Sequence, residues 1–489
     1  MFEPSKYQKA VYEEIKNGKS NILVNAVAGS GKTTTIINAM EFIPSNQKVL
    51  FLAFNKTVAE ELKERISAKN VEVSTFHSVC FKALRFKGRR KVDGKKMNNI
   101  INAMIEEKAE RYQYFSAIKK LVSVAKNEGV GFLMENSPET YNELIIKYSV
   151  IHPKAECDLE VLIDYSIKAY NLSLKDSYNI DFDDMVLFCL KEKPKFKWHK
   201  YVFVDEAQDL NQVQIALLDS IKKNGRLVAV GDPNQAIYGF RGADDKAFWD
   251  IQKKYFCKIL PLSVTYRCPK EIVQEAKEYV SSIESGIDRV GQVVHHGSFN
   301  KDIFSEKDSA ILSRKTSKLI SFAYSLMRHD VPCKILGKDL SINIVKFIKG
   351  FKSSLVKDLI LEMKKELDKE KNKDDVTLHD KIATVEVFYE NLFKTVSKRV
   401  APYWPVAVFC SKIEQFFEQC KTGIPLCTVH KAKGLEWDNV FILDRDDFMP
   451  RWATGQQIQQ ERNIVYVAVT RAKLNLHYIG SRDLEDKPL

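Results

Sequence analysis

The stretch AVAGSGKT, residues 26–33, combines the residue types that hold a phosphate chain. It follows the apolar run NILVN and precedes TTTIINAM, so a strand leads into the loop and a helix leaves it. Glycines let backbone N–H groups close on the phosphates, and the start of the helix adds its positive dipole end. Lys32 is predicted to reach the β- and γ-phosphates, and Thr33 to hold Mg²⁺. A glycine-rich turn without a ligand is the disfavoured alternative. The predicted nucleotide-binding residues of the loop are Ala28, Gly29, Ser30, Gly31, Lys32, Thr33 and Thr34.

A second motif is acidic: YVFVDEAQD, residues 201–209, supplies carboxylates at a strand end. Four apolar positions predict a buried strand, with Asp205 at its carboxyl end. Asp205 is predicted to hold Mg²⁺ through water, and Glu206 to orient and deprotonate the attacking water. Two adjacent carboxylates can also form a solvated turn, but a phosphate loop in the same chain favours catalysis. ATP and Mg²⁺ are therefore the predicted cofactors.

The run VAVGDPNQAIYGFRGA, residues 228–243, joins a buried strand to a cluster of aromatic and basic side chains. Gln235 follows the strand end Gly231-Asp232, and Tyr238, Phe240 and Arg241 come directly after it. Exposed aromatic rings can stack on unpaired bases, a contact worth roughly 1–3 kcal/mol per base. The alternative is that these rings fill a cleft inside the protein.

Short apolar runs alternate with helical patterns over much of the chain, which predicts parallel α/β sheets. The runs NILVNAV, KVLFLAF, VEVST, YVFVDEA, RLVAVGD and KILPLSV form a first lobe, and GQVVHHG, SAILSR, PCKILG and the segments around LCTVHK and KLNLHYIG form a second. We expect the first lobe at 1–80 and 177–262 with a helical insertion at 81–176, and the second at 263–346 and 405–489 with a short helical insertion at 347–404.

Composition limits the classes of protein. With 489 residues, the chain exceeds what a single core organises. Its formal net charge of +12 favours a polyanionic partner. No apolar run reaches the ~20 residues that span a bilayer, so no membrane partner is expected. The nine scattered cysteines form no C-x-x-C pair, which indicates reduced thiols in a cytoplasmic or nuclear setting and no zinc or disulfide framework.

Taken together and in order, DEAQD, GDPNQAIYGFRGA, TVHKAKGLEW and YVAVTRAK resemble the motifs of UvrD/Rep-type superfamily 1 DNA helicases. The resemblance runs from Gln8 to Lys473. The strings LAFNK, TFHS and HKAKGLEWD resemble especially the helicase core of the F-box DNA helicases. The resemblance implies two RecA-like P-loop lobes with ATP–Mg²⁺ between them, and 3′→5′ movement on single-stranded DNA.

The resemblance also implies roles for residues outside the phosphate loop. Arg267 and Arg471 would stabilise charge on the transferring γ-phosphate. Tyr266 would stack on adenine, whereas Thr34 stands where many relatives carry an arginine on the opposite face of the base. One-sided stacking would weaken the preference for ATP. The remaining implied contacts are Gln8 with adenine, Gln235 with the γ-phosphate and Glu436 with the ribose.

The resemblance implies a further set of residues that would line a channel for single-stranded DNA. Polar residues after strands can also cap helices or form turns, and this alternative stays open for Asn55, Thr75 and His77. The basic stretch Arg89–Lys96 is either a solvated loop or a duplex contact. His77 and His430 lack the company of other metal ligands, so no metal is assigned to them. The nucleic-acid candidates are Phe54, Asn55, Thr75, His77, Tyr238, Phe240, Arg241, Thr428 and His430.

The function predicted from these residues is an ATP-dependent DNA helicase or translocase that works as a monomer. Its expected partners are single-stranded DNA, DNA junctions, and recombination or replication proteins. A small-substrate P-loop kinase would need no second lobe with Arg471, and DNA-stimulated ATPase activity separates the two. An inactive nucleotide-gated scaffold would not need the complete catalytic set. The segment LNLHYIGSRDLEDKPL has room for one closing strand only. We therefore expect protein displacement with little duplex unwinding as the alternative activity.

Overall fold

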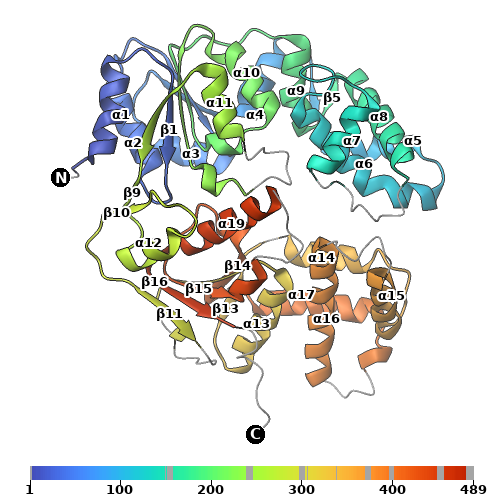
Figure 1. Ribbon diagram of the computed structural model, residues 1–489. Coiled ribbons are helices and arrows are strands. Elements are labelled where there is room, and N and C mark those ends of the chain that lie inside the picture. Colours follow the sequence, from blue (N-terminus) through green and yellow to red (C-terminus); the bar gives the residue numbers. More distant parts are fainter. Residues whose placement is uncertain are drawn as a thin grey trace. The chain divides into compact units, whose positions relative to one another are not determined.

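The computed structural model describes residues 3–148, 150, 158–237, 246–296, 303–304, 307–337, 339–368, 376–395, 401–448 and 456–480 (Figure 1). The chain divides into two compact units, one up to Val264 and the other from Thr265 onward. Each unit is built on a six-stranded sheet whose neighbouring strands run parallel. The predicted α/β class with two RecA-like lobes is confirmed.

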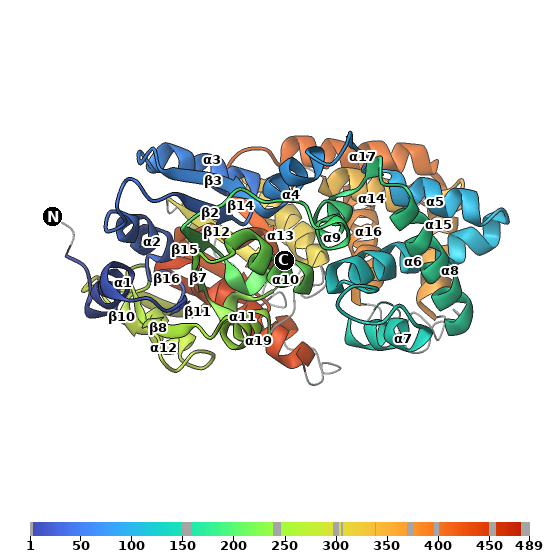
Figure 2. The ribbon, with the colours of Figure 1, turned by 90° about the horizontal axis from the view of Figure 1, so that it is seen from above.

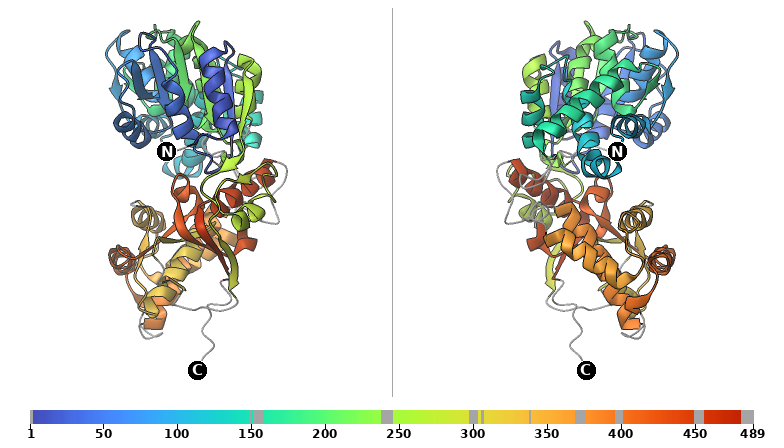
Figure 3. Two further views of the ribbon diagram at one scale, coloured as in Figure 1. Left: turned by 90° about the vertical axis from the view of Figure 1, so that its left-hand side faces the viewer. Right: turned by 90° about the vertical axis from the view of Figure 1, so that its right-hand side faces the viewer.

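The first sheet consists of the six apolar runs that the sequence predicts as strands. Alternate residues of these strands face opposite cores, so that Leu50 and Leu52 belong to one core and Phe51 to the other. Helices therefore cover both faces of the sheet (Figure 3). The strands are β1 (Ile22–Ala26), β2 (Val49–Ala53), β3 (Val71–Thr75), β6 (Tyr201–Val204), β7 (Arg226–Gly231) and β8 (Lys258–Leu262), in the order β3-β2-β6-β7-β1-β8.

Two groups of helices complete the first lobe. The core on one face contains α1 (Lys6–Asn17), α2 (Lys32–Met40) and α3 (Lys56–Arg65). The core on the other face is shared by α4 (Phe76–Arg85), α9 (Phe182–Glu192), α10 (Gln212–Lys222) and α11 (Ala247–Tyr255). The helices of the insertion extend this second core, so the insertion and the lobe share one apolar interior.

The first insertion lies between β3 and β6 in the sequence. Its helices gather beside the sheet (Figures 1 and 2), and its two short strands pair with each other in parallel. Its elements are β4 (Lys91–Val92), α5 (Lys96–Met104), α6 (Lys108–Glu128), α7 (Pro138–Lys147), α8 (Leu159–Lys175) and β5 (Asn179–Ile180).

A buried ion cluster ties this insertion to α9. Lys126 on α6 pairs with Asp181 at 2.6 Å and with Asp184 at 2.7 Å, and Lys96 on α5 pairs with Asp184 at 2.7 Å. The side chains of Lys126 and Asp184 are 1% and 0% exposed. We call Lys96, Lys126, Asp181 and Asp184 the insertion ion cluster.

The second sheet has the order β11-β16-β15-β12-β14-β13. Its strands are β11 (Gln292–His296), β12 (Ser309–Ser313), β13 (Cys333–Ile335), β14 (Ile424–Thr428), β15 (Trp437–Leu443) and β16 (Ala472–Ile479). One core of the unit joins this sheet to α13 (Thr316–Arg328), α14 (Leu340–Ile348), α15 (Val356–Asp368), α16 (Val376–Thr395) and α17 (Val406–Gln419). Two further helices, α12 (Lys270–Ala276) and α19 (Gln456–Val469), contact β16 and each other.

Helices between β13 and β14 run from Leu340 to Gln419, a wider interval than the predicted insertion at 347–404. The division of each lobe into a sheet domain and an insertion stays a prediction. Within the described ranges, every helix is too short or too polar to cross a membrane.

Candidate nucleotide and nucleic-acid sites

The phosphate loop connects the end of β1 to the first residue of α2, as the sequence predicts. Gly29 and Gly31 adopt left-handed backbone conformations with φ of 71° and 73°, which glycine reaches without a steric penalty. No side chain caps the amino end of α2, because its N-cap residue is Gly31. The buried hydroxyl of Ser30 has no hydrogen-bond partner in the part of the chain that the structure describes. Uncapped N–H groups and an unsatisfied hydroxyl fit the oxygens of a phosphate chain.

Lys32 begins α2 and reaches across to the end of β6. Its Nζ lies 3.1 Å from each carboxylate oxygen of Glu206. Although burial lowers it, the pKa of Lys32 is raised overall by the charges of Glu206, Asp232 and Asp205. Glu206 itself has a left-handed backbone with φ of 50°, a strain of roughly 1–3 kcal/mol that often marks functional positions. The lysine and the glutamate that the sequence predicts as catalytic residues therefore form an ion pair.

Asp205 precedes Glu206 at the end of β6 and is 4% exposed. Burial and the neighbouring charge of Glu206 raise the pKa of Asp205 to about 7. Adjacent carboxylates repel each other, most strongly where one of them is buried as Asp205 is, and a divalent cation relieves that repulsion. The acidic strand end therefore fits Mg²⁺, with the Asp205 carboxylate and the Thr33 hydroxyl as the groups that would hold it.

A hydrogen-bonded chain continues from Glu206 through Gln208, a residue to which the sequence analysis assigns no role. The Gln208 amide donates to Glu206 at 2.5 Å, and its carbonyl accepts from the backbone N–H of Asp232 at 3.0 Å. Asp232 in turn accepts from the Gln235 amide at 2.7 Å. A Cβ at Gly231 would lie 2.3 Å from the Gln208 carbonyl oxygen, so this contact requires glycine there. Glu206, the predicted general base, is thus linked through hydrogen bonds to Gln235, the predicted sensor of the γ-phosphate.

Gln8 lies beside the phosphate loop and is 1% exposed. It forms a capping box with Ser5 at the start of α1, and its amide also donates to the Thr35 hydroxyl at 3.0 Å. The structure adds Arg65, which no motif contains. Arg65 ends α3, and its guanidinium donates to the Thr34 hydroxyl at 3.4 Å. A guanidinium therefore contacts Thr34, the position at which the resemblance implies an arginine in many relatives.

Four residues with implied nucleotide roles lie in the second unit. The Arg267 guanidinium donates to Glu436 at 2.6 Å and to the Thr470 carbonyl at 3.0 Å. Arg471 is 1% exposed and donates to two backbone carbonyls. Burial and the charge of Arg267 lower the pKa of Arg471 to about 9, which leaves it cationic at neutral pH. Tyr266 is half-buried and precedes Arg267 in the chain.

Two nucleic-acid candidates of the first unit are helix caps. The Asn55 side chain accepts from the N–H of Val58 at 2.9 Å, and the Thr75 hydroxyl accepts from the N–H of Ser78 at 3.2 Å. Asn55 and Thr75 therefore cap helices, as the alternative to a DNA contact predicts, and their contact with nucleic acid stays a prediction. Ala53 at the end of β2 is the register partner of Thr75 at the end of β3. Phe54 and Asn55, which follow β2, therefore begin beside the end of β3.

An exposed aromatic ring extends this edge. Phe182, the first residue of α9, is 61% exposed, and its ring lies edge-on to His77 with centroids 6.2 Å apart. Burial lowers the pKa of His77, so its imidazole is neutral at physiological pH. Phe182 was not predicted. The signal available in the sequence was an aromatic residue directly after the helix cap Asp181.

The other nucleic-acid candidates are distributed over the chain. Thr428 ends β14 and His430 lies in α18 (Val429–Ala432), both in the second unit. Tyr238, Phe240 and Arg241 fall outside the described residues, so their contacts with bases stay a prediction.

A phosphate loop at a strand end, an acidic strand end and two parallel six-stranded sheets define a P-loop protein with two RecA-like lobes. The profile of the UvrD/REP helicase N-terminal domain matches residues 7–256, and that of the UvrD-like helicase C-terminal domain matches residues 343–482. The chain therefore belongs to the UvrD/Rep family of DNA helicases, enzymes that hydrolyse ATP in a DNA-dependent way.

The relatives that resemble this chain are themselves named as DNA helicases. The chain is 24% identical to the probable DNA helicase II homolog of Mycoplasma capricolum, over 92% of this chain and 81% of the relative. It is 26% identical to the F-box DNA helicase protein 1 of Schizosaccharomyces pombe, over 96% and 56%. It is 28% identical to the ATP-dependent DNA helicase PcrA of Bacillus subtilis, over 55% and 39%. The chain thus spans only about half or less of the length of the last two relatives.

Proposed function

We propose that this chain is an ATP-dependent helicase that moves 3′→5′ on single-stranded DNA and uses hydrolysis to unwind duplex or to displace bound proteins. The observation that carries the proposal is the connected set formed by Lys32, Glu206, Gln208, Asp232 and Gln235. It links the phosphate loop, the acidic strand end and the loop after β7, which leads into the predicted DNA-stacking segment.

The ion pair between Lys32 and Glu206 suggests how hydrolysis is gated. Lys32 would exchange its carboxylate partner for the phosphates when nucleotide binds, which leaves the Glu206 carboxylate able to accept a proton from water. Thr33 and Asp205 would hold Mg²⁺, which neutralises charge on the phosphates when bound. Gln208 would keep Glu206 oriented while Lys32 moves away.

Three assays on the full chain test this function. ATPase rates are compared with single-stranded DNA, with RNA and without nucleic acid. Duplexes with a 3′ or a 5′ tail test polarity, and streptavidin displacement from biotinylated strands tests protein removal. We expect stimulation by DNA and activity on 3′-tailed substrates. Preference for a 5′ tail would overturn the polarity, and an ATPase indifferent to nucleic acid would overturn the helicase proposal.

Phe182→Ala is expected to reduce DNA-stimulated ATPase activity at subsaturating DNA by roughly 5- to 150-fold, because one stacked base contributes about 1–3 kcal/mol. Phe256→Ala is the matched control, since Phe256 is an 88% exposed aromatic residue of the same unit outside the candidate sites. Apparent DNA affinity from ATPase titrations measures the effect. Equal behaviour of the two variants would exclude Phe182 as a stacking residue.

The Arg65 guanidinium, which contacts Thr34, would stack on the adenine of ATP. Arg65→Ala is therefore expected to weaken ATP binding by about 2- to 5-fold, the size of a partly exposed cation–π contact. Glu61→Ala is the control, because it removes the 3.2 Å ion partner of Arg65 and leaves the guanidinium in place. Fluorescent ATP titration gives the dissociation constants. Adding Thr34→Arg to Arg65→Ala should restore the affinity for ATP. If Arg65→Ala binds ATP normally and the added arginine changes nothing, Arg65 does not contact the adenine.

A further inference from the structure

A cavity of about 320 Å³ opens at the amino ends of β2, β3 and β6. We call it the amino-edge cavity. Its walls are the turns that precede these strands, with Lys48, Lys69 and the loop from Lys197 to His199 among them. Strands of five residues extend roughly 17 Å, and the phosphate loop follows the carboxyl end of β1. The amino-edge cavity is therefore a site distinct from the nucleotide site, at the opposite edge of the same sheet.

Cations outnumber anions around this cavity. Lys197 donates to Glu72 at 2.7 Å, and Lys82 lies 3.6 Å from the same carboxylate. Burial raises the pKa of Glu72, but the hydrogen bond and charge of Lys197 lower it overall, so this carboxylate is ionised and neutralised. The described residues offer no carboxylate partner to Lys48 or Lys69 within ion-pair distance. The cavity therefore carries uncompensated positive charge.

His199 adds a buried group that lacks its hydrogen bonds. The residue is 3% exposed, and neither ring nitrogen has a partner with hydrogen-bond geometry among the described residues. Its Nε2 lies 3.4 Å from the Glu72 carboxylate without hydrogen-bond geometry. Burial lowers the pKa of His199, although the interaction with Glu72 raises it, so the imidazole is neutral at physiological pH. A neutral imidazole carries one N–H donor, and buried donors in native proteins nearly always find an acceptor, which can be an ion or a water molecule.

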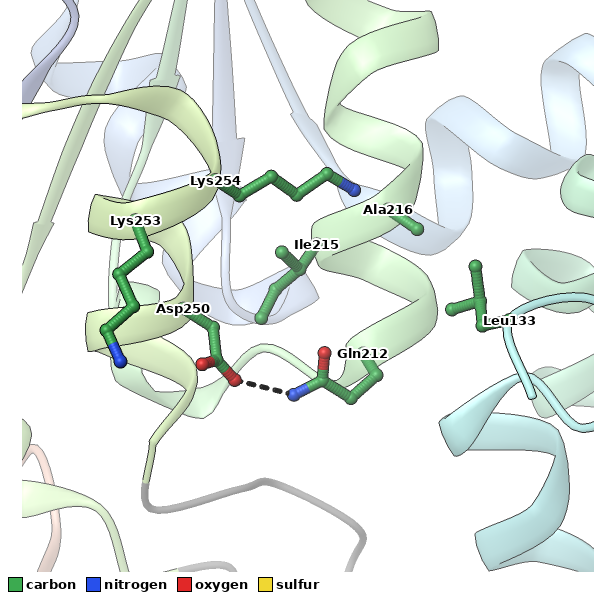
Figure 4. A pocket seen from close by; sticks show the side chains of 7 residues that line it. All are labelled: Leu133, Gln212, Ile215, Ala216, Asp250, Lys253 and Lys254. Carbon is green, nitrogen blue, oxygen red and sulfur yellow. Dashed lines mark hydrogen bonds between the residues drawn. The ribbon is translucent and has the colours of Figure 1, made fainter.

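A larger cavity shows that volume alone does not mark such a site. About 500 Å³ lies between α10 and α11 (Figure 4). There the Gln212 amide donates to Asp250 at 2.9 Å, and Lys254 pairs with Asp219 at 3.5 Å. None of the residues that line that cavity has a buried polar side-chain atom without a hydrogen-bond partner among the described residues, whereas His199 of the amino-edge cavity does.

We propose that the amino-edge cavity binds a small phosphate-bearing anion. Lysines bind phosphate as point charges, and the His199 imidazole supplies a donor from the cavity wall. A volume of about 320 Å³ is at the lower end of ligand pockets, which suits a pyrophosphate or a terminal phosphate group better than a whole nucleotide. The phosphate comes either from a free anion or from a DNA strand, and both sources present the same chemistry.

Titration of the full chain with pyrophosphate tests the site, with the ¹³C-labelled His199 ring followed by NMR and assigned through His199→Gln. The Lys32→Ala background weakens binding at the phosphate loop, so that a shift of His199 there reports on the amino-edge cavity. We expect saturable shifts of His199 in that background, and at least a tenfold loss of affinity in Lys48→Ala/Lys69→Ala. Lys253→Ala/Lys254→Ala, a pair of lysines at the other cavity, should leave the affinity unchanged.

A parallel titration with a short DNA duplex distinguishes the two sources. Shifts with pyrophosphate support a free anion, and shifts with DNA alone support a strand phosphate, provided that either depends on Lys48 and Lys69. The proposal is overturned if neither ligand moves His199, or if the two lysine pairs behave alike.

Discussion

Glu206→Gln is expected to bind ATP nearly as tightly as the parent and to hydrolyse it at least ~10²-fold more slowly, the loss expected for a general base. In the structure, Lys32 and the Gln208 amide both contact the Glu206 carboxylate, and these contacts hold it at the phosphate loop. Glutamine keeps the size of the side chain and a carbonyl acceptor for Lys32, so the phosphate loop should stay intact. Fluorescent-nucleotide binding and single-turnover hydrolysis separate the two effects.

Two controls accompany this variant. Lys32→Ala should weaken both binding and turnover, because it removes the cation that would face the phosphates. Glu60→Gln changes an exposed glutamate on α3 and should change neither. If Glu206→Gln hydrolyses ATP at the parent rate, the base is another group.

The nucleotide loop and the strands could be predicted because their signals are local. A buried parallel strand is a continuous apolar run, and the loop needs glycines and Lys32 at fixed spacing. All six strands of the first sheet follow from such runs. The resemblance to the family assigns roles to residues of the second unit, which stay predictions, and two of these residues, Arg267 and Glu436, are in contact.

Contacts between distant parts of the chain could not be predicted in this way. Arg65 meets Thr34 across 31 positions, and Gln208 meets Asp232 across 24. Such pairs depend on how helices and strands pack, which no periodicity encodes. The wider helical interval around the second insertion has a similar cause. Ile344 and Val345 of α14 belong to the same core as α13, so no change of composition marks a boundary before residue 347.

Loss of the insertion ion cluster should have the largest effect on stability. Lys126→Ala leaves Asp184 with a single cationic partner in a site that water does not reach. Although burial lowers it, the charges of Asp184 and Asp181 raise the pKa of Lys126, so this lysine is charged in the native protein, whereas burial lowers the pKa of Lys96. Breaking a buried pair by removal of one partner costs about 3–5 kcal/mol. Lys168→Ala, which removes an exposed pair with Asp164, should cost about 1 kcal/mol or less.

The same change should reach the nucleic-acid edge, because the cluster carboxylates also form the capping box of α9. Asp181 accepts from the N–H of Asp184 at 2.8 Å, and Asp184 accepts from that of Asp181 at 3.1 Å. Phe182 is the residue that this cap positions. Hydrogen exchange should therefore accelerate at the start of α9 in Lys126→Ala, together with a loss of DNA-stimulated ATPase activity. Lys126→Met keeps most of the apolar stem and should show the same exchange, which assigns the effect to charge. Exchange at α9 as slow as in Lys168→Ala would mean that the cluster does not hold the insertion in place.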